Sequence, residues 1–558
     1  MRQDPVPTSV GDAPTSGVGA RSGAWRMEVA ALALFAALAV AHTWPLAAAP
    51  GRWSRNDSGD TLLNEWAIAW VAHQSVTDPI HLFDANIFYP EKRTLAFSEH
   101  LLPQAAMVAP LLWAGGSPVL AHNLALLLGF ILTGWAMCHM IRVWTGSWES
   151  GLVAGSLAAF NAHTLIRVAH LQAQHLEFLP LALLALDRAL AAPRVRHALW
   201  LAVWFACQAL TSGYMLVFAA VSMVCATAAR ADEWIGQRFR RVAPLLVLSA
   251  VLAGLLILPF MLPYRFVRQE YGLVRTLGEV AGYSAVLTDY LATGARVHAA
   301  WSARFLRGDG LFPGVFALVL ATTTVATGLA WRDRRARMLL AIAVATCCFS
   351  FGVNFPPYPW LFRTVPLFDA IRAAIRFGQV TLLAVAALAG YGVSWWLAKL
   401  PTRRARLIVA AVLIGFVNLE ALRAPMGYVE YHGESPVFKR LAAQPHAVIA
   451  CFPFYHDGGA VGANGHYMLS STLHWRPMLN GYSGFMPPSF YRHATGVRTF
   501  PLPESIAYLK QAGVTHVVVD TARLSQHRVE LLQQAPGLRL WAADAGIRIY
   551  VLEGQVGR

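Results

Sequence analysis

Long apolar segments separated by short polar gaps dominate the chain up to about residue 425. A membrane-crossing helix needs about 20 mostly apolar residues in succession. The pattern predicts membrane-spanning helices at 26–48, 118–142, 149–165, 176–192, 197–212, 214–230, 243–263, 311–331, 337–353, 378–398 and 405–423. The segment 101–116 is short, contains two prolines and ends in Gly-Gly, so it is either re-entrant or a further span. We therefore expect a transmembrane domain over 25–425 with eleven or thirteen spans.

A different pattern begins near Tyr428, where short apolar runs alternate with amphipathic ones. It predicts strands at 446–454 and 514–520, helices at 504–513 and 526–534, and two closing strands, LRLWAA and IRIYVLE. Helices that alternate with strands indicate a small α/β domain over 428–558. The expected fold class is thus a polytopic α-helical membrane protein with a small C-terminal extracytoplasmic α/β domain.

Composition and charge agree with a membrane protein. Hydrophobic residues make up 56% of the chain and charged residues only 13%, whereas soluble domains have about 25% charged residues. The net charge of +15 does not indicate nucleic-acid binding, because the basic residues cluster in gaps between apolar segments. The arginine-rich gaps are Arg188–Arg196, Arg230–Arg241, Arg332–Arg337 and Lys399–Arg406.

Placing these gaps in the cytoplasm satisfies the positive-inside rule and fixes the topology. The N-terminus is then cytoplasmic, with residues 1–24 as a disordered tail rich in Gly, Ser, Pro and Thr. The C-terminal domain lies outside, and the charge pattern suits a bacterial inner (plasma) membrane.

The first outer loop, 49–104, is longer and richer than a simple connector. It carries seven carboxylates and several aromatic residues, so we interpret it as a structured active-site loop. Asp60 and Asp57 follow the first span, where a carboxylate can act as a general base. Asp60 is alternatively the N-cap of the helix TLLNEWAIAWVAHQ. Trp66 and Trp70, four residues apart in that helix, are expected to anchor it at the membrane interface.

Four further groups of polar residues are expected on the same side. Glu99 and His100 return to the membrane face at the end of the loop, either as an acid/base or metal group with Asp60 or as polar residues at a helix start. Arg372 and Arg376 lie four apart, which suits a phosphate on one helix face. The alternative for these arginines is snorkelling toward lipid headgroups.

The run HTLIRVAHLQAQHLEF contains Arg167, His170 and His175 at spacings that can share one side of a helix. Its histidines are candidates for metal binding, for a phosphate or sugar pocket, or for an ordinary interfacial helix. The segment 456–493 is dense in Gly, aromatic residues, His and Asn, and includes His466 and Tyr482. It either closes over a polar substrate or packs as a long ordered loop.

Several motifs are absent from the sequence. There is no GxGxxG after a strand and no P-loop, so nucleotide binding is not supported. There is no GxSxG elbow and no CxxC pair. The candidates for chemistry are therefore the polar residues that gather on the outer side.

This pattern resembles the GT-C superfamily of integral-membrane glycosyltransferases and is similar to bacterial membrane proteins of the YfhO-like group. The features that carry the resemblance are GDTLLNEWAIAW, FYP…FSEH, IRAAIRFGQ and NGYSGF. The resemblance implies an essential Asp in the first outer loop, matched best by Asp60 and next by Asp57. It also implies a polyprenyl-phosphate-linked sugar donor and transfer on the outer face. The chain lacks a paired Asp-Asp motif, so a divalent cation stays an option and no residue is assigned as a metal ligand.

The leading hypothesis is a membrane glycosyltransferase that moves a sugar from a polyprenyl-phosphate donor to a glycan, lipid or protein acceptor. Asp60 would deprotonate or orient the acceptor hydroxyl, and Arg372 and Arg376 would hold the lipid phosphate. One alternative is a transporter or flippase of a lipid-linked precursor, although the chain shows no inverted repeat. The other alternative is a non-catalytic envelope assembly factor, which needs no cavity near Asp60.

Overall fold

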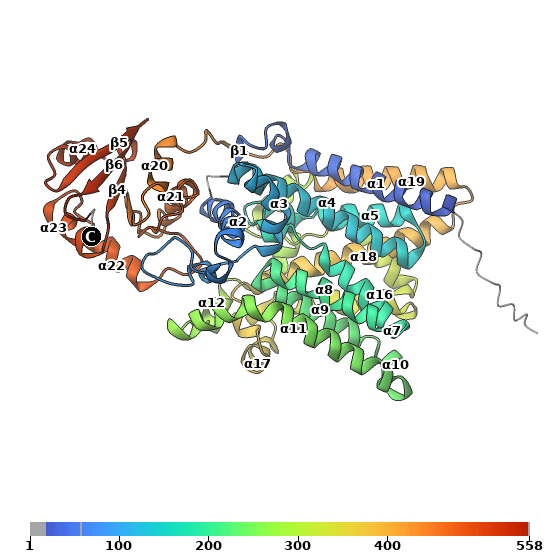
Figure 1. Cartoon of the computed structure of the whole chain (residues 1–558). Coiled ribbons are helices and arrows are strands. Elements are labelled where there is room, and N and C mark those ends of the chain that lie inside the picture. The colour runs from blue at the N-terminus through green and yellow to red at the C-terminus, as the bar shows by residue number, and fades with distance from the viewer. Residues whose placement is uncertain (1–17, 56–57, 556–558) are drawn as a thin grey trace, which may run out of the picture.

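The computed structural model describes residues 18–55 and 58–555. A bundle of helices forms the larger part, and a smaller part built around a β-sheet caps one end of the bundle (Figure 1). The helices of the larger part are α1 (Val18–His42), α2 (Gly59–Thr77), α3 (Leu102–Trp113), α4 (Pro118–Thr145), α5 (Trp148–Ala159), α6 (Ala162–Ile166), α7 (Phe178–Ala191), α8 (Val195–Thr211), α9 (Gly213–Ala228), α10 (Ala231–Trp234), α11 (Phe239–Glu270), α12 (Leu277–Ala281), α13 (Ala299–Ser302), α14 (Val315–Ala326), α15 (Leu329–Arg332), α16 (Arg334–Ser350), α17 (Tyr358–Thr364), α18 (Phe377–Ala398) and α19 (Arg403–Ala421).

Every expected span overlaps helix in the bundle, although 149–165 and 311–331 are each divided between two helices. Among the described residues, four helical segments are long and apolar enough to cross a membrane on their own: Trp25–His42, Pro118–Thr145, Gly236–Glu270 and Ala374–Ala398. Leu102–Trp113, Gly213–Ala228 and Val315–Ala326 are shorter apolar helices. The polytopic helical fold is confirmed, whereas the number of crossings stays a prediction.

Two of the expected helix boundaries differ in the structure. The expected span 149–165 is divided, because α5 ends at Ala159 and Asn161 caps the separate helix α6 with its side chain. The first helix begins at Val18, inside the expected tail 1–24, because the helix extends ahead of its apolar core; residues 1–17 lie outside the described residues. It ends at His42 rather than near 48, just before Pro45, which has no backbone N–H to continue a helix.

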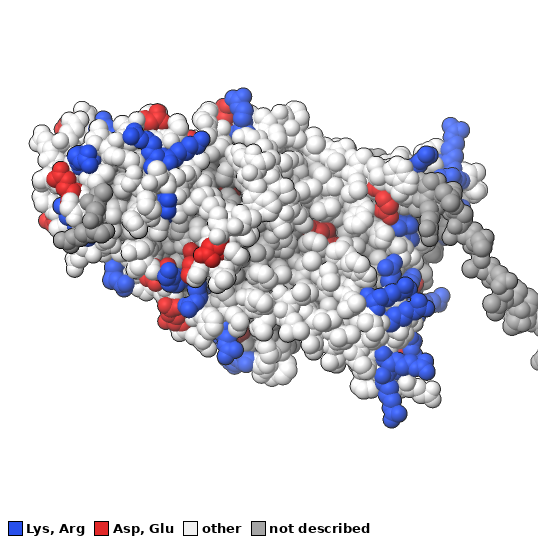
Figure 2. Space-filling view, viewed as in Figure 1, with Lys and Arg blue, Asp and Glu red and all other residues white. Residues whose placement is uncertain are grey.

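The flank of the bundle is apolar and its far end is basic. Large hydrophobic side chains such as Val251 and Leu255 on α11, and Ile408 and Phe416 on α19, are about half exposed. Lys and Arg side chains gather at the end of the bundle away from the sheet, near α10 (Figure 2). An apolar flank between polar ends is what lipid requires of an integral membrane protein.

A buried ion cluster fixes helices at the basic end. The Arg230 guanidinium is fully buried, and it donates to Asp187 Oδ1 at 2.6 Å and to both carboxylate oxygens of Glu233 at 2.6 Å. Arg335 donates to the other oxygen of Asp187 at 2.9 Å. The cluster ties α7 to α10 and α16, since each charge there has an opposite partner.

Close helix packing in the bundle depends on glycine at the contact of α14 and α18. A Cβ added to Gly392 of α18 would overlap the Leu320 carbonyl of α14. Gly415 of α19, in contrast, has open space around it. The two positions therefore differ in what a methyl group would meet.

The smaller part is a mixed four-stranded sheet with helices around it. Its elements are α20 (Lys439–Ala442), β3 (Ile449–Phe452), α21 (Asn464–Ser471), α22 (Pro488–Gly496), α23 (Pro503–Gln511), β4 (His516–Asp520), α24 (Gln526–Gln533), β5 (Leu538–Asp544) and β6 (Ile547–Leu552). The strand order is β3-β4-β6-β5, with β3 and β4 parallel and the other neighbours antiparallel. The expected strands and helices of this region are confirmed, and a small α/β fold follows.

The first outer loop and the C-terminal part form one packed unit. β1 (Trp53–Ser54) pairs with β2 (Val429–Glu430), and Tyr89 N–H donates to the Met478 carbonyl at 2.9 Å. Helix α2 packs on α21, so the loop lies between the bundle and the sheet (Figure 1). One continuous core contains side chains of both α2 and the C-terminal part.

This packing corrects the interpretation of the two tryptophans. Trp66 and Trp70 are 1% and 4% exposed, so they are core residues rather than interfacial anchors. The indole of Trp66 donates to Asn86 Oδ1 at 3.2 Å, and that of Trp70 to the Leu82 carbonyl at 2.8 Å. The covering C-terminal part, which lies far away in the sequence, explains the difference.

Candidate functional site

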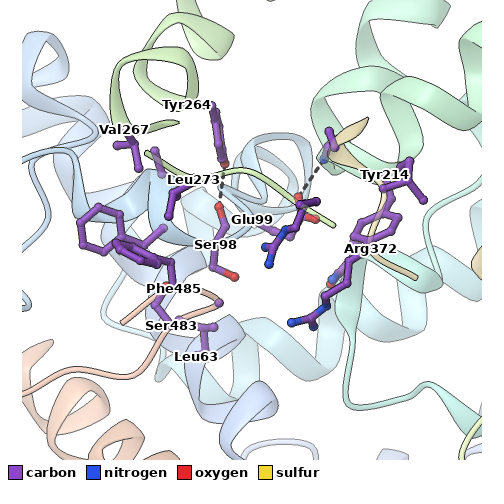
Figure 3. A pocket seen from close by; sticks show the side chains of 18 of the residues that line it. Leu63, Ser98, Glu99, Tyr214, Tyr264, Val267, Leu273, Arg372, Ser483 and Phe485 are labelled. Atoms are coloured by element: carbon purple, nitrogen blue, oxygen red, sulfur yellow. Dashed lines mark hydrogen bonds between the residues drawn. The ribbon is translucent and has the colours of Figure 1, made fainter. Parts of the chain in front are cut away.

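A cavity of about 520 Å³ lies where the first outer loop, the ends of α9 and α11, and the C-terminal part meet (Figure 3). Its polar lining includes residues from each of the expected groups. From the run 167–175, His170 lines the cavity and the residues at the two ends of the run do not. The side chains that line it include Asp60, Asn64, Ser98, Glu99, His170, Gln172, Tyr214, Tyr264, Arg268, Arg275, Asp369, Arg372, Arg376, Tyr482, Ser483 and Phe485. Seven separate regions of the sequence thus supply one pocket.

Asp60 lies in the first turn of α2 and is held by two neighbours. Tyr482 Oη donates to Asp60 Oδ1 at 2.9 Å, and His170 Nε2 lies 3.2 Å from Asp60 Oδ2. Gly59 permits this arrangement, because a Cβ there would meet the Cα of Gly462 at 2.9 Å. Asp60 is not the N-cap, since Ser58 has that position.

The surroundings keep Asp60 ionised. The hydrogen bond with His170 is the main cause that lowers the pKa of Asp60 to about 2, and it outweighs the opposing effect of burial. Burial lowers the pKa of His170, so this imidazole is neutral near pH 7 and donates from Nε2. A carboxylate of such low pKa is a weak base that stays ionised and can accept a hydrogen bond.

Glu99 faces the same cavity from the end of the outer loop (Figure 3). Its Oε2 accepts a hydrogen bond from the Gly213 backbone N–H at 2.8 Å. Burial nevertheless raises the pKa of Glu99. Beside it, Tyr264 Oη donates to the Ser98 carbonyl at 2.8 Å and fixes the end of the loop against α11.

Arg372 and Arg376 bring two positive charges into the cavity. The Arg372 guanidinium lies 5.0 Å from the ring centre of Tyr283, and that of Arg376 lies 4.8 Å from the ring centre of Tyr214. Within the described part of the chain, neither has a carboxylate within ion-pair distance. Two guanidinium groups that aromatic rings position, and that no described carboxylate binds within ion-pair distance, suit a phosphate.

The local structure around these arginines differs from the expected helix face. Arg376 ends a 3₁₀ turn (Ala374–Arg376) immediately before α18, and Arg372 lies in a bend ahead of that turn. The Ala373 N–H donates to Tyr214 Oη at 3.2 Å, which holds the segment against α9. The arginines therefore converge by a bend in the chain and not by helical spacing.

The histidine run also differs from the expected helix. It forms the short helix α6, a turn, and a 3₁₀ turn (Leu171–Ala173) before α7 begins. Only His170 of the predicted trio lines the main cavity. Arg167 binds both oxygens of Asp309, one at 2.5 Å, and His175 is fully buried with its ring bonded to Glu177 at 2.9 Å.

The remaining predicted residues lie elsewhere. His100 is fully buried behind the cavity wall, where its ring packs edge-on against Phe83 and Tyr264. His466 lines a different cavity in the C-terminal part. Asp57 lies outside the described residues.

Sequence reasoning missed several residues of the cavity. Tyr214 and Tyr264 lie within apolar segments. The sequence feature that could have identified them as cavity residues is a hydroxyl group near the end of a predicted span. Arg268 lies in the last turn of α11 and Arg275 follows that helix, on the side that the charge pattern predicts to be outside, against the positive-inside rule. That bias was the signal that could have identified them.

The described residues contain no group of three or more His, Cys, Asp or Glu side chains arranged to hold a metal ion. A divalent cation therefore stays a prediction, without assigned ligands.

An apolar groove of about 700 Å³ adjoins the site along α11. It is lined by side chains of α7, α8, α9 and α11, among them Leu201, Phe205, Leu216, Ile257 and Met261. One turn further along α11, Tyr264, Val267 and Arg268 line the polar cavity. The groove thus leads along one helix to the cavity.

The bundle, the loop helix packed over a polar cavity, and the C-terminal cap together form a fold that is known from solved glycosyltransferase structures. Two solved structures share this fold. The arabinofuranosyltransferase AftD from Mycobacteria matches with a TM-score of 0.59 at 16% identity, over 94% of this chain and 40% of that chain. The oligosaccharyltransferase from Archaeoglobus fulgidus matches with a TM-score of 0.50 at 14% identity, over 94% of this chain and 74% of that one.

The chain thus spans less than half the length of AftD. No family model matches the chain, and no curated protein matches its sequence. The expected GT-C resemblance is confirmed at the level of the fold.

Proposed function

We propose that this protein transfers a sugar from a polyprenyl-phosphate donor to an acceptor hydroxyl on the outer face of the membrane. The observation that carries the proposal is the cavity in which an ionised Asp60 faces the two arginines Arg372 and Arg376. A transfer site needs cations where it binds the donor phosphate and an anion where it binds the acceptor hydroxyl. The GT-C fold supports the same class of reaction.

In the proposed step, the acceptor oxygen forms a bond to the anomeric carbon while the bond from that carbon to the phosphate oxygen breaks. Polyprenyl phosphate leaves with the electron pair, and the arginines stabilise its charge. Asp60 accepts a hydrogen bond from the acceptor hydroxyl and takes its proton as the new bond forms. Because the pKa of Asp60 is low, orientation contributes more than its basicity.

The apolar groove along α11 supplies a place for the polyprenyl chain. A lipid whose phosphate lies between the arginines has its chain directed along α11, where the groove begins one turn away. Its lining is almost entirely apolar and open to the side. The basic end of the bundle would lie in the cytoplasm of a bacterial inner membrane, which places the cavity and the C-terminus outside (Figure 2).

The test is release of polyprenyl phosphate from a panel of polyprenyl-phosphate sugars by purified protein in nanodiscs. Wild type, Asp60→Asn and the control Asp78→Asn are compared. Asp78 lies in the same loop at the far end of α2, where it is about half exposed and contacts His81. We expect release by wild type and Asp78→Asn, and a loss of at least about 100-fold in Asp60→Asn.

Equal release by Asp60→Asn and wild type would remove Asp60 from the chemistry. Binding of the lipids without release by any folded protein would favour a transporter or flippase. A non-catalytic assembly factor would neither bind nor turn over the lipids, and it would have no use for the cavity beside Asp60. Addition and removal of Mg²⁺ or Mn²⁺ in the same assay decides whether a divalent cation is required.

A further inference from the structure

A second cavity, of about 510 Å³, lies in the C-terminal part between the segment 429–435, α21 and the end of β4. Among the described residues, it shares no lining side chain with the cavity at Asp60. Its size is that of a small-molecule site. The transfer step described above makes no use of it.

The charges around this second cavity cancel within the protein. Asp520 is paired with Arg523 at 3.1 Å, and Glu430 is paired with Arg52. Glu434 is buried and accepts a hydrogen bond from Ser470 Oγ. Burial raises the pKa of Glu434, so its carboxyl group tends toward the neutral form.

Besides these paired charges, the lining of the second cavity offers neutral hydrogen-bonding groups beside aromatic rings. His466 lines the cavity, and its ring forms no hydrogen bond with any other described residue. Burial lowers the pKa of His466 to about 4, so the ring is neutral and offers one donor and one acceptor. Tyr431, Tyr467 and Phe438 add aromatic surface to the lining.

This chemistry selects among ligand classes. An anion would find Arg523 already neutralised, and a cation would find no free carboxylate. A sugar presents hydroxyl groups that both donate and accept, together with apolar C–H faces that pack on aromatic rings. A neutral carbohydrate therefore fits the lining best.

The position of the cavity connects it to the transfer site. His466, Tyr467 and Ser470 of α21 line the second cavity. Gly465 of the same helix packs on Leu62 of α2, where a Cβ would lie 2.7 Å from the Leu62 Cβ. Leu62 is two residues from Asp60, so the contact between α21 and α2 connects the walls of the two cavities.

We propose that the second cavity binds a neutral glycan, as the distal part of an acceptor whose reacting hydroxyl reaches Asp60. Binding in this cavity follows from its own lining. The role as acceptor rests on the proposed transferase function.

The experiment measures binding of neutral gluco-, manno-, galacto- and arabino-oligosaccharides to the full-length protein in nanodiscs by saturation-transfer difference NMR. No lipid donor is added. We expect saturable binding of at least one oligosaccharide, weakened at least about 10-fold by His466→Ala and abolished by His466→Trp, which fills the cavity. Glu434→Gln, which keeps a polar side chain of the same size, is expected to retain binding within about threefold.

Two variants keep the result interpretable. His527→Ala removes an exposed histidine of α24 that does not line the cavity, and it is expected to bind like wild type. Arg376→Gln, which changes only the phosphate end of the transfer site, is expected to bind the oligosaccharide normally while losing donor binding, so failure of glycan binding and failure of transfer are separate results. Absence of saturable binding, wild-type binding by both His466 variants, or preference for a uronate oligosaccharide or a peptide would overturn the proposal.

Discussion

Replacing Arg376 with glutamine tests how the site holds phosphate. The change removes a positive charge and keeps a polar side chain of similar reach. In the structure Arg376 lies over Tyr214 and has no carboxylate partner among the described residues, so its loss leaves no buried anion unpaired. We therefore expect affinity for phosphate to fall while the fold is retained.

The magnitude follows from the kind of contact. A hydrogen bond to a charged group contributes about 1.5–3 kcal/mol. Since about 1.4 kcal/mol corresponds to a tenfold change, Arg376→Gln should weaken binding of polyprenyl phosphate roughly 10- to 150-fold. The lost contact with Tyr214 should cost only about 0.5–1 kcal/mol of stability.

The assay is titration of polyprenyl phosphate into protein in nanodiscs, with the melting temperature recorded for each variant. Arg304→Gln is the matched control, because Arg304 lies 4.8 Å from the ring centre of Phe305 but does not line the cavity. The control should bind normally. If a folded double variant of Arg372 and Arg376 bound the lipid as tightly as wild type, the phosphate would be held elsewhere.

Three further outcomes are expected. His170→Ala removes the main cause of the low pKa of Asp60. The fall in rate at acid pH, which reports protonation of Asp60, should therefore move to higher pH in the variant. An unchanged acid side of the pH–rate profile would contradict the pairing of Asp60 with His170. Arg230→Ala removes the buried cation that Asp187 and Glu233 share and leaves each carboxylate with a single arginine, Arg335 or Arg334, so it should cost about 3 kcal/mol in reversible unfolding in detergent, a result that an unchanged midpoint would refute. Gly392→Ala should destabilise the bundle by about 1–3 kcal/mol through overpacking, whereas Gly415→Ala should be neutral or stabilising by up to about 1 kcal/mol; equal thermal shifts would argue against the close α14–α18 contact.

Much of the fold could be predicted from local properties of the sequence. Apolar length locates a membrane helix whatever surrounds it, and alternation of short patterns located the strands β3 and β4. Asp60, Glu99 and the two arginines could be identified because charged residues stand out beside apolar spans. Their meeting in one cavity was expected from their common side of the membrane.

The rest depends on contacts between distant parts of the chain. The sequence pattern around an aromatic residue in a polar loop is the same whether lipid or protein covers the side chain. The burial of Trp66 under the C-terminal part could therefore not be predicted from the sequence. His466 and Tyr482 lie in one loop segment, yet they line different cavities on either side of α21. The tyrosines of α9 and α11 were missed because a hydroxyl hardly changes an apolar pattern.

The interleaving of the first outer loop with the C-terminal part has a consequence for biosynthesis. Asp60 and the tyrosine that holds it are 422 positions apart, and most of the bundle is synthesised between them. At a synthesis rate of about 5–20 residues per second, the segments that cover α2 are made some tens of seconds after α2 itself. Its apolar face needs a temporary partner in that interval, such as the membrane surface or a chaperone. The site is therefore completed last, so a chain truncated before Tyr482 would be inserted but inactive.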